Sequence, residues 1–513
     1  MPHRSINALI WTAVAVSFVH FLFLVLVAQK VSTIAVITAG VALAMLVPGV
    51  VRLAGATQNT RFRNLAVLLM VFLATSWLNQ EDRFDLNRTS TALLGMTIIN
   101  GERGAESVTD GVILIDEQGL IERVGSLETI KVPETYHRID LPGKFVLPGL
   151  INAHGHMILP GRDRDPDEDP PPILGLPDWA VSLVGWFMET YAGEKVALWM
   201  MANNAERAIA GGVTTLRSLG DPNFYDLKLR QLIENGQRRG PRLLAAGQLL
   251  CVTGGHAHQI GQVVDGPIEG RRAVRHSLRM GVDVIKIAST GGVADSRRIG
   301  EAGELQMTPE EIRAIVDEAH RKNILVAAHV ESSQGVLEAL REGVDSIEHG
   351  AELDDEAIAL FLNNPLSLRG YSTLHPTLSV GWIMGDLTDA IRNDPQLYII
   401  YRNGEEIRQR MTTGYKQALE KGVHIGLGTD AGLVDHGTVW KELKHMVEVG
   451  GITAADAIHV GTLATAESIG VADITGSITP GKFADLLVVD GNPLEDIEAL
   501  SEPYLVMTEG IVY

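Results

Sequence analysis

Apolar runs of strand length alternate with amphipathic helical patterns through most of this 513-residue chain. Such alternation predicts parallel βα units, because parallel strands that are buried on both faces are joined by crossover helices. One helical stretch, residues 308–323, opens with Thr308, Pro309 and Glu311, which is a capping box with proline in the first turn. The strand-like runs include VTTLRS, PRLLAAG, VDVIKIAS, ILVAAHV, VDSIEHG and VHIGLGTD. We expect an α/β barrel over residues 149–475, with its chemistry at the carboxyl ends of the strands.

Short strand patterns lie on both sides of this barrel region. Residues 81–148 begin with a polar stretch and continue through GVILIDEQGLIERVG, which predicts a hairpin that turns at Gln118 and Gly119. Residues 476–513 have a similar texture in FADLLVVDGNP and YLVMTEGIVY. Strand-forming segments therefore flank the barrel region at both ends.

The first 80 residues contain Arg and Lys but no Asp or Glu, and they include uncharged apolar runs at 6–29 and 31–51. Each run exceeds the roughly 18 residues that indicate a membrane-spanning helix. A shorter run at 64–79 is either a third span or an interfacial helix. These features predict a multi-pass membrane protein anchored in the lipid bilayer. Three spans would place the catalytic domain outside the cytoplasm and two would keep it inside; we favour three.

The composition excludes some classes of function. The formal net charge is −20, and an acidic chain of this kind is not expected to bind nucleic acid. Cys251 is the only cysteine, so the chain can form neither an internal disulfide nor a thiolate metal cage. A metal site would therefore use histidine, carboxylate and lysine side chains. The oligomeric state stays open.

Potential metal ligands follow the predicted strands in a fixed order. Considered singly, each has an ordinary explanation: a buried histidine, a lysine that reaches solvent, or an aspartate that caps a helix. The ordered set is His154 and His156, then Lys286, His329, His349 and Asp430. His154 and His156 are two residues apart on a strand, so their side chains point to the same side. Together these groups predict a site for divalent ions, Zn²⁺ first, with Mn²⁺, Co²⁺ or Fe²⁺ as alternatives.

The set and its surroundings resemble the amidohydrolase superfamily, in its binuclear branch with a carboxylated lysine on the fourth strand. The motifs LPGLINAHGH, GVTTLRSLG, VDVIKIASTGGV, GVDSIEHG, LGTDAG and GSITPGKFADLLVVDGNPLEDI are similar to those of imidazolonepropionase-like and Xaa-Pro dipeptidase-like metal-dependent hydrolases. The resemblance covers residues 92–513 and implies a (β/α)₈ TIM-type barrel. It also implies that both flanks pair as one small β-sandwich.

The resemblance further implies how two metal ions would be held. His154, His156 and Asp430 would bind the more buried ion, and His329 and His349 would bind the second. Lys286, carboxylated by CO₂, would bridge the two. Such a pair can share a hydroxide that attacks a polarised carbonyl. Asp430 would accept the proton of that hydroxide and return it to the leaving amine.

These implications favour a hydrolase that cleaves an amide-type C–N bond in a small peptide, an N-acyl amino acid or a cyclic amide. The alternatives are an ester, lactone or organophosphate hydrolase on the same metals, and a non-catalytic membrane receptor or scaffold. The scaffold is disfavoured because no ligand of the set is missing.

Four further side chains are candidate contacts for a small-molecule substrate. Glu331 stands where peptidase-like relatives often carry a tyrosine that binds a substrate carboxylate. It either favours an amine or neutral group of the substrate or points to a neighbouring arginine or to solvent. His256 and His258 lie in the loop TGGHAHQ after the third strand, and His375 ends the run before the seventh loop. Loops at this end of a barrel line the active-site mouth.

Overall fold

The computed structural model describes residues 84, 86–161, 184–382 and 389–513. The chain divides into two compact units, one of residues 1–80 and 172–196 and one of residues 81–171 and 197–513. Of the first unit, residues 184–196 are described. The barrel, the flanking sheet and the candidate site all lie in the second unit.

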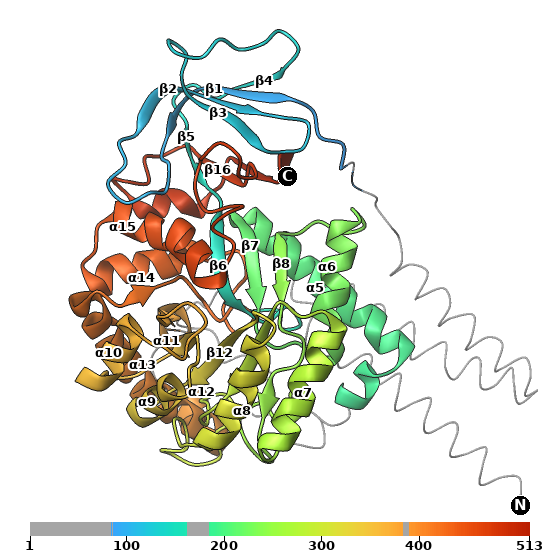
Figure 1. Cartoon of the computed structure of the whole chain (residues 1–513), viewed down its shortest axis with the longest axis vertical. Coiled ribbons are helices and arrows are strands. Elements are labelled where there is room, and N and C mark those ends of the chain that lie inside the picture. Colours follow the sequence, from blue (N-terminus) through green and yellow to red (C-terminus); the bar gives the residue numbers. More distant parts are fainter. Residues whose placement is uncertain (1–83, 85, 162–183, 383–388) are drawn as a thin grey trace, which may run out of the picture. The chain divides into compact units, whose positions relative to one another are not determined.

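Eight parallel strands of the described chain form a barrel (Figure 1). In order they are β6 (Leu150–Gly155), β7 (Val213–Ser218), β8 (Arg242–Ala245), β11 (Val284–Ala288), β12 (Leu325–Val330), β13 (Ser346–His349), β14 (Thr373–His375) and β15 (His424–Ile425). β6–β8 form one hydrogen-bonded sheet, and β11–β15 form another together with the short strands β9 (Leu250–Cys251) and β10 (Gln262–Val263). Backbone hydrogen bonds join the two sheets: Asp283 N–H donates to the Ala245 carbonyl at 2.8 Å, and Ala153 N–H donates to the Leu427 carbonyl at 2.9 Å. The fold is of the TIM-barrel type, as predicted.

Helices lie between consecutive barrel strands along the chain and after the last of them (Figure 1). They are α5 (Tyr191–Ala210), α6 (Tyr225–Glu234), α7 (Pro267–Met280), α8 (Pro309–His320), α9 (Ser333–Arg341), α10 (Asp355–Leu362), α11 (Leu378–Trp382), α12 (Asp389–Asn393), α13 (Pro395–Lys421), α14 (Trp440–Gly450), α15 (Ala454–His459) and α16 (Thr465–Ile469). Short turns of other helix types are Pro222–Phe224, Val460–Ala464 and Ile497–Ser501. The predicted capping box of α8 is confirmed, since Thr308 N–H donates to the Glu311 carboxylate at 2.8 Å and the Thr308 side chain accepts from Glu311 N–H.

The two flanks share one mixed sheet of eight strands. Its strands are β1 (Thr91–Ile98), β2 (Val108–Ile115), β3 (Ile121–Ser126), β4 (His137–Asp140), β5 (Phe145–Pro148), β16 (Leu486–Val489), β17 (Leu505–Thr508) and β18 (Ile511–Val512). β5 pairs antiparallel with β16, which joins the N-terminal flank to the C-terminal one. The predicted hairpin is confirmed as β2 and β3, where Gly119 has φ +82° and Asp116 accepts hydrogen bonds from the Gln118 and Leu120 N–H groups.

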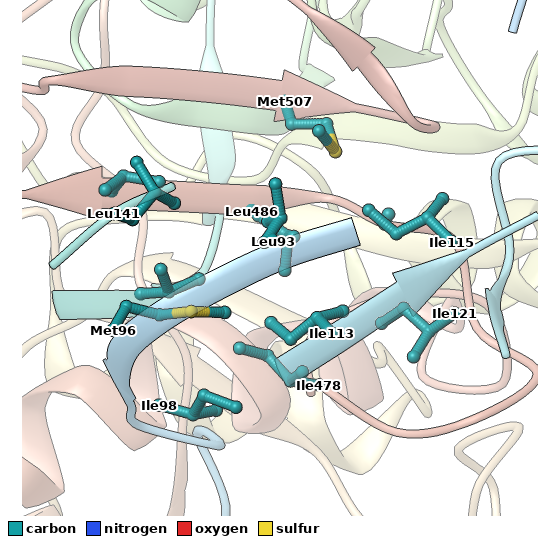
Figure 2. Close-up of a cluster of buried hydrophobic side chains, with 13 residues drawn as sticks. Leu93, Met96, Ile98, Ile113, Ile115, Ile121, Leu141, Ile478, Leu486 and Met507 are labelled. Carbon is teal, nitrogen blue, oxygen red and sulfur yellow. The ribbon is translucent and has the colours of Figure 1, made fainter. Parts of the chain in front are cut away.

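A hydrophobic cluster connects the two halves of this sheet (Figure 2). Leu93 and Ile113 from the N-terminal flank are buried with Leu486 and Met507 from the C-terminal flank. The hydrogen-bonded order of the strands is continuous through β5 and β16, so the two flanks form one sheet with a shared core. Its arrangement as a β-sandwich stays a prediction. Burial of these apolar side chains holds segments together that are more than 300 residues apart in the sequence.

The predicted localisation as a multi-pass membrane protein with an extracytoplasmic catalytic domain is contradicted. Among the residues that the structure describes, no helix has both the length and the apolar character that a membrane span requires. α13 has 27 residues and is long enough, but it carries charged groups such as Arg402, Glu405 and Arg410, which a bilayer core disfavours. The predicted spans at 6–29, 31–51 and 64–79 lie outside the described residues.

Candidate metal centre

The predicted ligands come from five of the barrel strands or the segments that follow them. His154 belongs to β6 and His156 follows it, Lys286 is in the middle of β11, His329 is near the end of β12, His349 ends β13, and Asp430 follows β15. The strand register keeps neighbouring ligands within two residues of each other, since His329 pairs with Ala288, two residues after Lys286, and with Glu348, the residue before His349. Parallel strands in register therefore bring these side chains to one end of the barrel.

Asp430 joins the two histidines of the first strand. Its Oδ1 lies 3.2 Å from His156 Nε2 and 3.5 Å from His154 Nε2. The ring centroid of His154 is also 5.1 Å from that of His349, and one ligand atom from each of His154, His349 and Asp430 lies within 4.8 Å of the others. These distances fit a single ion held by imidazole and carboxylate ligands.

A second group shares His349. The rings of His329 and His349 have centroids 4.7 Å apart, and ligand atoms of His329, Glu331 and His349 lie within 4.8 Å of one another. Both groups are buried, so an ion bound there would be screened little by solvent. The described residues thus hold two adjacent groups that could bind metal ions.

Lys286 is buried beside both groups. Its side chain is 3% exposed, and its Nζ has no hydrogen-bond partner among the described residues. Burial lowers the pKa of Lys286 to about 8, and Glu348 and Asp430 oppose that shift. A buried, unpaired amine is costly, which indicates that Lys286 has a role other than stabilising the metal-free fold.

Three of the four histidines of the centre, His154, His329 and His349, favour the neutral form that binds metals. Burial lowers the pKa of His154 to about 4 and holds the pKa of His329 and of His349 well below the usual value. Burial also acts to lower the pKa of His156, but the hydrogen bond to Asp430 and its charge outweigh burial and raise that pKa. Burial also disfavours the charge on Asp430, but the neighbouring His154 and His156 outweigh it and lower the Asp430 pKa. Neutral imidazoles next to a carboxylate are a ligand set for Zn²⁺ and related ions.

His349 and Asp430 have unusual backbone conformations. Their φ angles are +70° and +59°, in the left-handed region that side chains other than glycine rarely adopt. Residues held this way persist only where the surrounding structure enforces them, and they cluster at functional sites. The backbone therefore directs both side chains into the centre at some cost in stability.

Glu348 orients the ligand His154 through the ring nitrogen Nδ1. The sequence did not indicate Glu348 as a site residue. Its carboxylate accepts from Arg217 at 2.8 Å and lies 2.9 Å from His154 Nδ1 and 3.1 Å from His375 Nδ1. Glu348 and Arg217 are both fully buried. A carboxylate on Nδ1 fixes the ring orientation and leaves Nε2 free for a metal ion. The available sign was a charged residue within a predicted strand, at Arg217 and at Glu348.

We expect Glu348→Gln to destabilise the protein by about 3 kcal/mol, because it leaves the buried Arg217 guanidinium without its counter-charge. Metal affinity should also fall about 10–100-fold, since the substitution weakens the hydrogen bond between residue 348 and His154 Nδ1, which orients the imidazole. Urea unfolding and metal titration would measure the two effects. Glu338→Gln, on the outside of α9, is the matched control and should change neither. Wild-type stability and affinity in Glu348→Gln would contradict this role.

Other positioning residues were also missed. Asp221 accepts from the Met157 and Ile158 N–H groups at 3.1 and 2.8 Å, which fixes the turn after His156. Asn152 donates to the Thr429 hydroxyl at 2.8 Å and so links β6 to the segment that leads to Asp430. Such contacts depend on residues far apart in the chain, so no local pattern predicts them.

The predicted substrate contacts have different surroundings. His256 stacks on His329 with centroids 4.2 Å apart, and its Nδ1 lies 2.8 Å from Asp295 Oδ1. His258 lines a small polar cavity with His256, and its Nδ1 faces the Gly255 carbonyl at 3.2 Å. The cavity, of about 50 Å³, opens beside the second group of ligands.

His375 does not have the surroundings of a substrate contact, so that prediction is corrected. It is fully buried, and both ring nitrogens have partners: Nδ1 faces Glu348 at 3.1 Å and Nε2 faces the Ser468 hydroxyl at 3.0 Å. No free polar atom remains for a ligand. His375 instead supports Glu348 from the side opposite His154.

Comparison with known proteins gives the family. The amidohydrolase family model matches residues 145–512. Ochratoxinase of Aspergillus niger is 30% identical over 340 residues, which are 59% of this chain and 65% of that protein's own length. A solved structure from Bifidobacterium longum, provisionally named a prolidase, is 36% identical with a TM-score of 0.71, covering 83% of this chain and 95% of that one. A Xaa-Pro dipeptidase with bound methionine is 31% identical with a TM-score of 0.69, covering 83% and 100%. The chain therefore belongs to the amidohydrolase family.

Proposed function

We propose that this protein is a metal-dependent hydrolase that cleaves an amide-type C–N bond in a small molecule. The observation that carries the proposal is the buried Lys286, whose Nζ has no hydrogen-bond partner among the described residues and whose charge acts on His154, His329 and His349, the histidines of two ligand groups that share His349. The similarity to ochratoxinase and to a Xaa-Pro dipeptidase supports C–N bond hydrolysis as the reaction class.

The ligands divide between two divalent ions in this proposal. His154, His156 and Asp430 would hold the first ion, and His329 and His349 the second. Zn²⁺ suits this set best, and Mn²⁺, Co²⁺ and Fe²⁺ also suit it. The fit rests on three imidazoles that favour the neutral form, on a carboxylate close to both His154 and His156, and on an amine that has no hydrogen-bond partner among the described residues.

Lys286 would become a ligand by reacting with CO₂. The neutral amine adds to the carbon of CO₂, a new N–C bond forms, and one proton is released as the amine becomes a carbamate. The product carries a negative charge in place of a positive one. It would bridge the two ions, which gives the buried side chain the partners that it lacks.

Asp430 would carry the proton during the reaction. When bound, a pair of divalent ions acidifies water and polarises a carbonyl oxygen. Asp430 lies between His154 and His156, so its Oδ1 faces the first group of ligands and can accept the proton of the attacking water. Returning that proton to the leaving nitrogen would complete cleavage. Glu348 would hold His154 in the correct tautomer throughout.

A substrate panel tests the proposal. The purified full chain, stripped with a chelator and reloaded with Zn²⁺ or Mn²⁺ in bicarbonate buffer, would be offered dipeptides, N-acyl amino acids, cyclic amides, esters and lactones. We expect amide turnover that disappears on chelation and returns with metal. Metal-dependent turnover of esters or lactones alone would replace the amide assignment, and a chain without turnover or bound metal would favour a scaffold.

A further inference from the structure

We infer that Glu331 is a ligand of the second metal ion, where the sequence favoured a substrate contact. The inference rests on the proposed function, because it requires divalent ions at this centre. Glu331 Oε1 lies 3.9 Å from His329 Nε2, and one atom from each of Glu331, His329 and His349 lies within 4.8 Å of the others. These separations match ligand atoms around one ion better than a hydrogen-bonded pair.

One oxygen of the Glu331 carboxylate, Oε2, lacks a partner among the described residues. The residue is 5% exposed, and its Oε2 is buried with no hydrogen bond to any described residue. His256 attracts its negative charge, Asp295 and Asp430 repel it, and Arg410 attracts it more weakly than His256 does. Burial of a carboxylate in such surroundings is unfavourable unless a cation pairs with its negative charge. A divalent ion between Glu331 and the two histidines would supply the positive charge.

The backbone of Glu331 is fixed tightly. Its N–H donates to the Thr290 hydroxyl at 3.1 Å, and its carbonyl oxygen lies so close to Gly303 that a Cβ there would meet it at 2.6 Å. The side chain therefore leaves a rigid position directly after β12. A metal ligand benefits from such preorganisation, because little conformational freedom is lost on binding.

A carboxylate ligand at Glu331 would change which metal ion the second site prefers. Two imidazoles, one bridging group and a water would give the second ion four ligands, and catalytic sites of this kind can expand to five, which leaves room for one carboxylate oxygen. A carboxylate oxygen is a hard ligand, and hard ligands favour Mn²⁺ more than imidazole does. Removal of the Glu331 charge should therefore weaken the second site more for Mn²⁺ than for Zn²⁺.

Calorimetric metal titration of the full chain tests this assignment, with Glu331→Gln compared with wild type. We expect wild type to bind two ions per chain, and Glu331→Gln to keep the first and bind the second at least about tenfold more weakly. The loss should be larger with Mn²⁺ than with Zn²⁺. Glu304→Gln removes an exposed carboxylate that pairs with Arg298, and it should bind both ions as wild type does. Wild-type affinity for the second ion in Glu331→Gln would overturn the inference.

Thermal unfolding gives an independent measurement. Without metal, Glu331→Gln should be at least as stable as wild type, because it removes an ionisable group that is buried without a partner. With saturating Mn²⁺ the order should reverse, since wild type gains more from the second ion. A metal-free Glu331→Gln that is less stable or does not fold would count against a ligand role. Less than one ion per wild-type chain would instead refute the proposed function itself.

Discussion

A Lys286→Met variant is expected to be more stable than wild type without metal, yet inactive with it. Methionine fills a similar volume and removes an amine that is 3% exposed and has no hydrogen-bond partner among the described residues. The gain in free energy of unfolding should be about 1–3 kcal/mol, the usual cost of a buried unpaired polar group. Urea unfolding of the chelated proteins would measure it.

If Lys286 bridges the two ions as proposed, the same substitution should reduce turnover at least about 10³-fold, because it would remove several kcal/mol of metal-derived stabilisation. Lys322→Met, an exposed site at the end of α8, is the matched control and should change stability by less than about 0.5 kcal/mol. A Lys286→Met protein that is destabilised and retains wild-type turnover would show that the lysine has only a packing role.

An Asp430→Asn variant should lose activity by at least about 10³-fold, since it removes both a ligand and the proton carrier. Asparagine suits this position because it tolerates the left-handed backbone of Asp430, φ +59°, better than alanine does. The variant should therefore fold normally, and its defect should be chemical. Circular dichroism and metal content would separate folding from binding.

Measuring the metal content also separates the proposed role of Asp430 as a ligand from its proposed role as a proton carrier. If the first ion is lost, added metal at high concentration should restore binding but little turnover, because asparagine cannot accept the proton. Asp473→Asn, an exposed aspartate, is the control. Full recovery of turnover at high metal concentration would leave Asp430 a ligand without a role in proton transfer.

The sequence predicted the barrel and the meeting of its ligands because both depend on regular geometry. Strand ends of parallel βα units lie at one end of a barrel, so His154, His329 and His349 had to be close. The spacing of His154 and His156 on one strand likewise placed both beside the same carboxylate, that of Asp430. The chemical role of each ligand is a proposal that the experiments above test.

Contacts between distant segments could not be predicted in this way. His375 ends β14 as a substrate contact would, but Ser468 and Glu348 occupy both of its nitrogens. Arg217 and Glu348 are on different strands, and only the folded barrel shows that they pair. The sequence indicated a substrate contact at Glu331 and not a metal ligand, because its closeness to His349 depends on the packing of two neighbouring strands. The membrane prediction used the apolar runs alone, and none of the described helices supports it.

The central claim is that two divalent ions bind at one barrel mouth with Lys286 between them. Crystals of the full chain grown with Mn²⁺ and bicarbonate, measured for anomalous scattering, test it most directly. We predict two anomalous peaks, one beside His154, His156 and Asp430 and one beside His329 and His349, with extra density extending Lys286 Nζ between them. A single peak, or an unmodified Lys286 that contacts neither ion, would contradict the account.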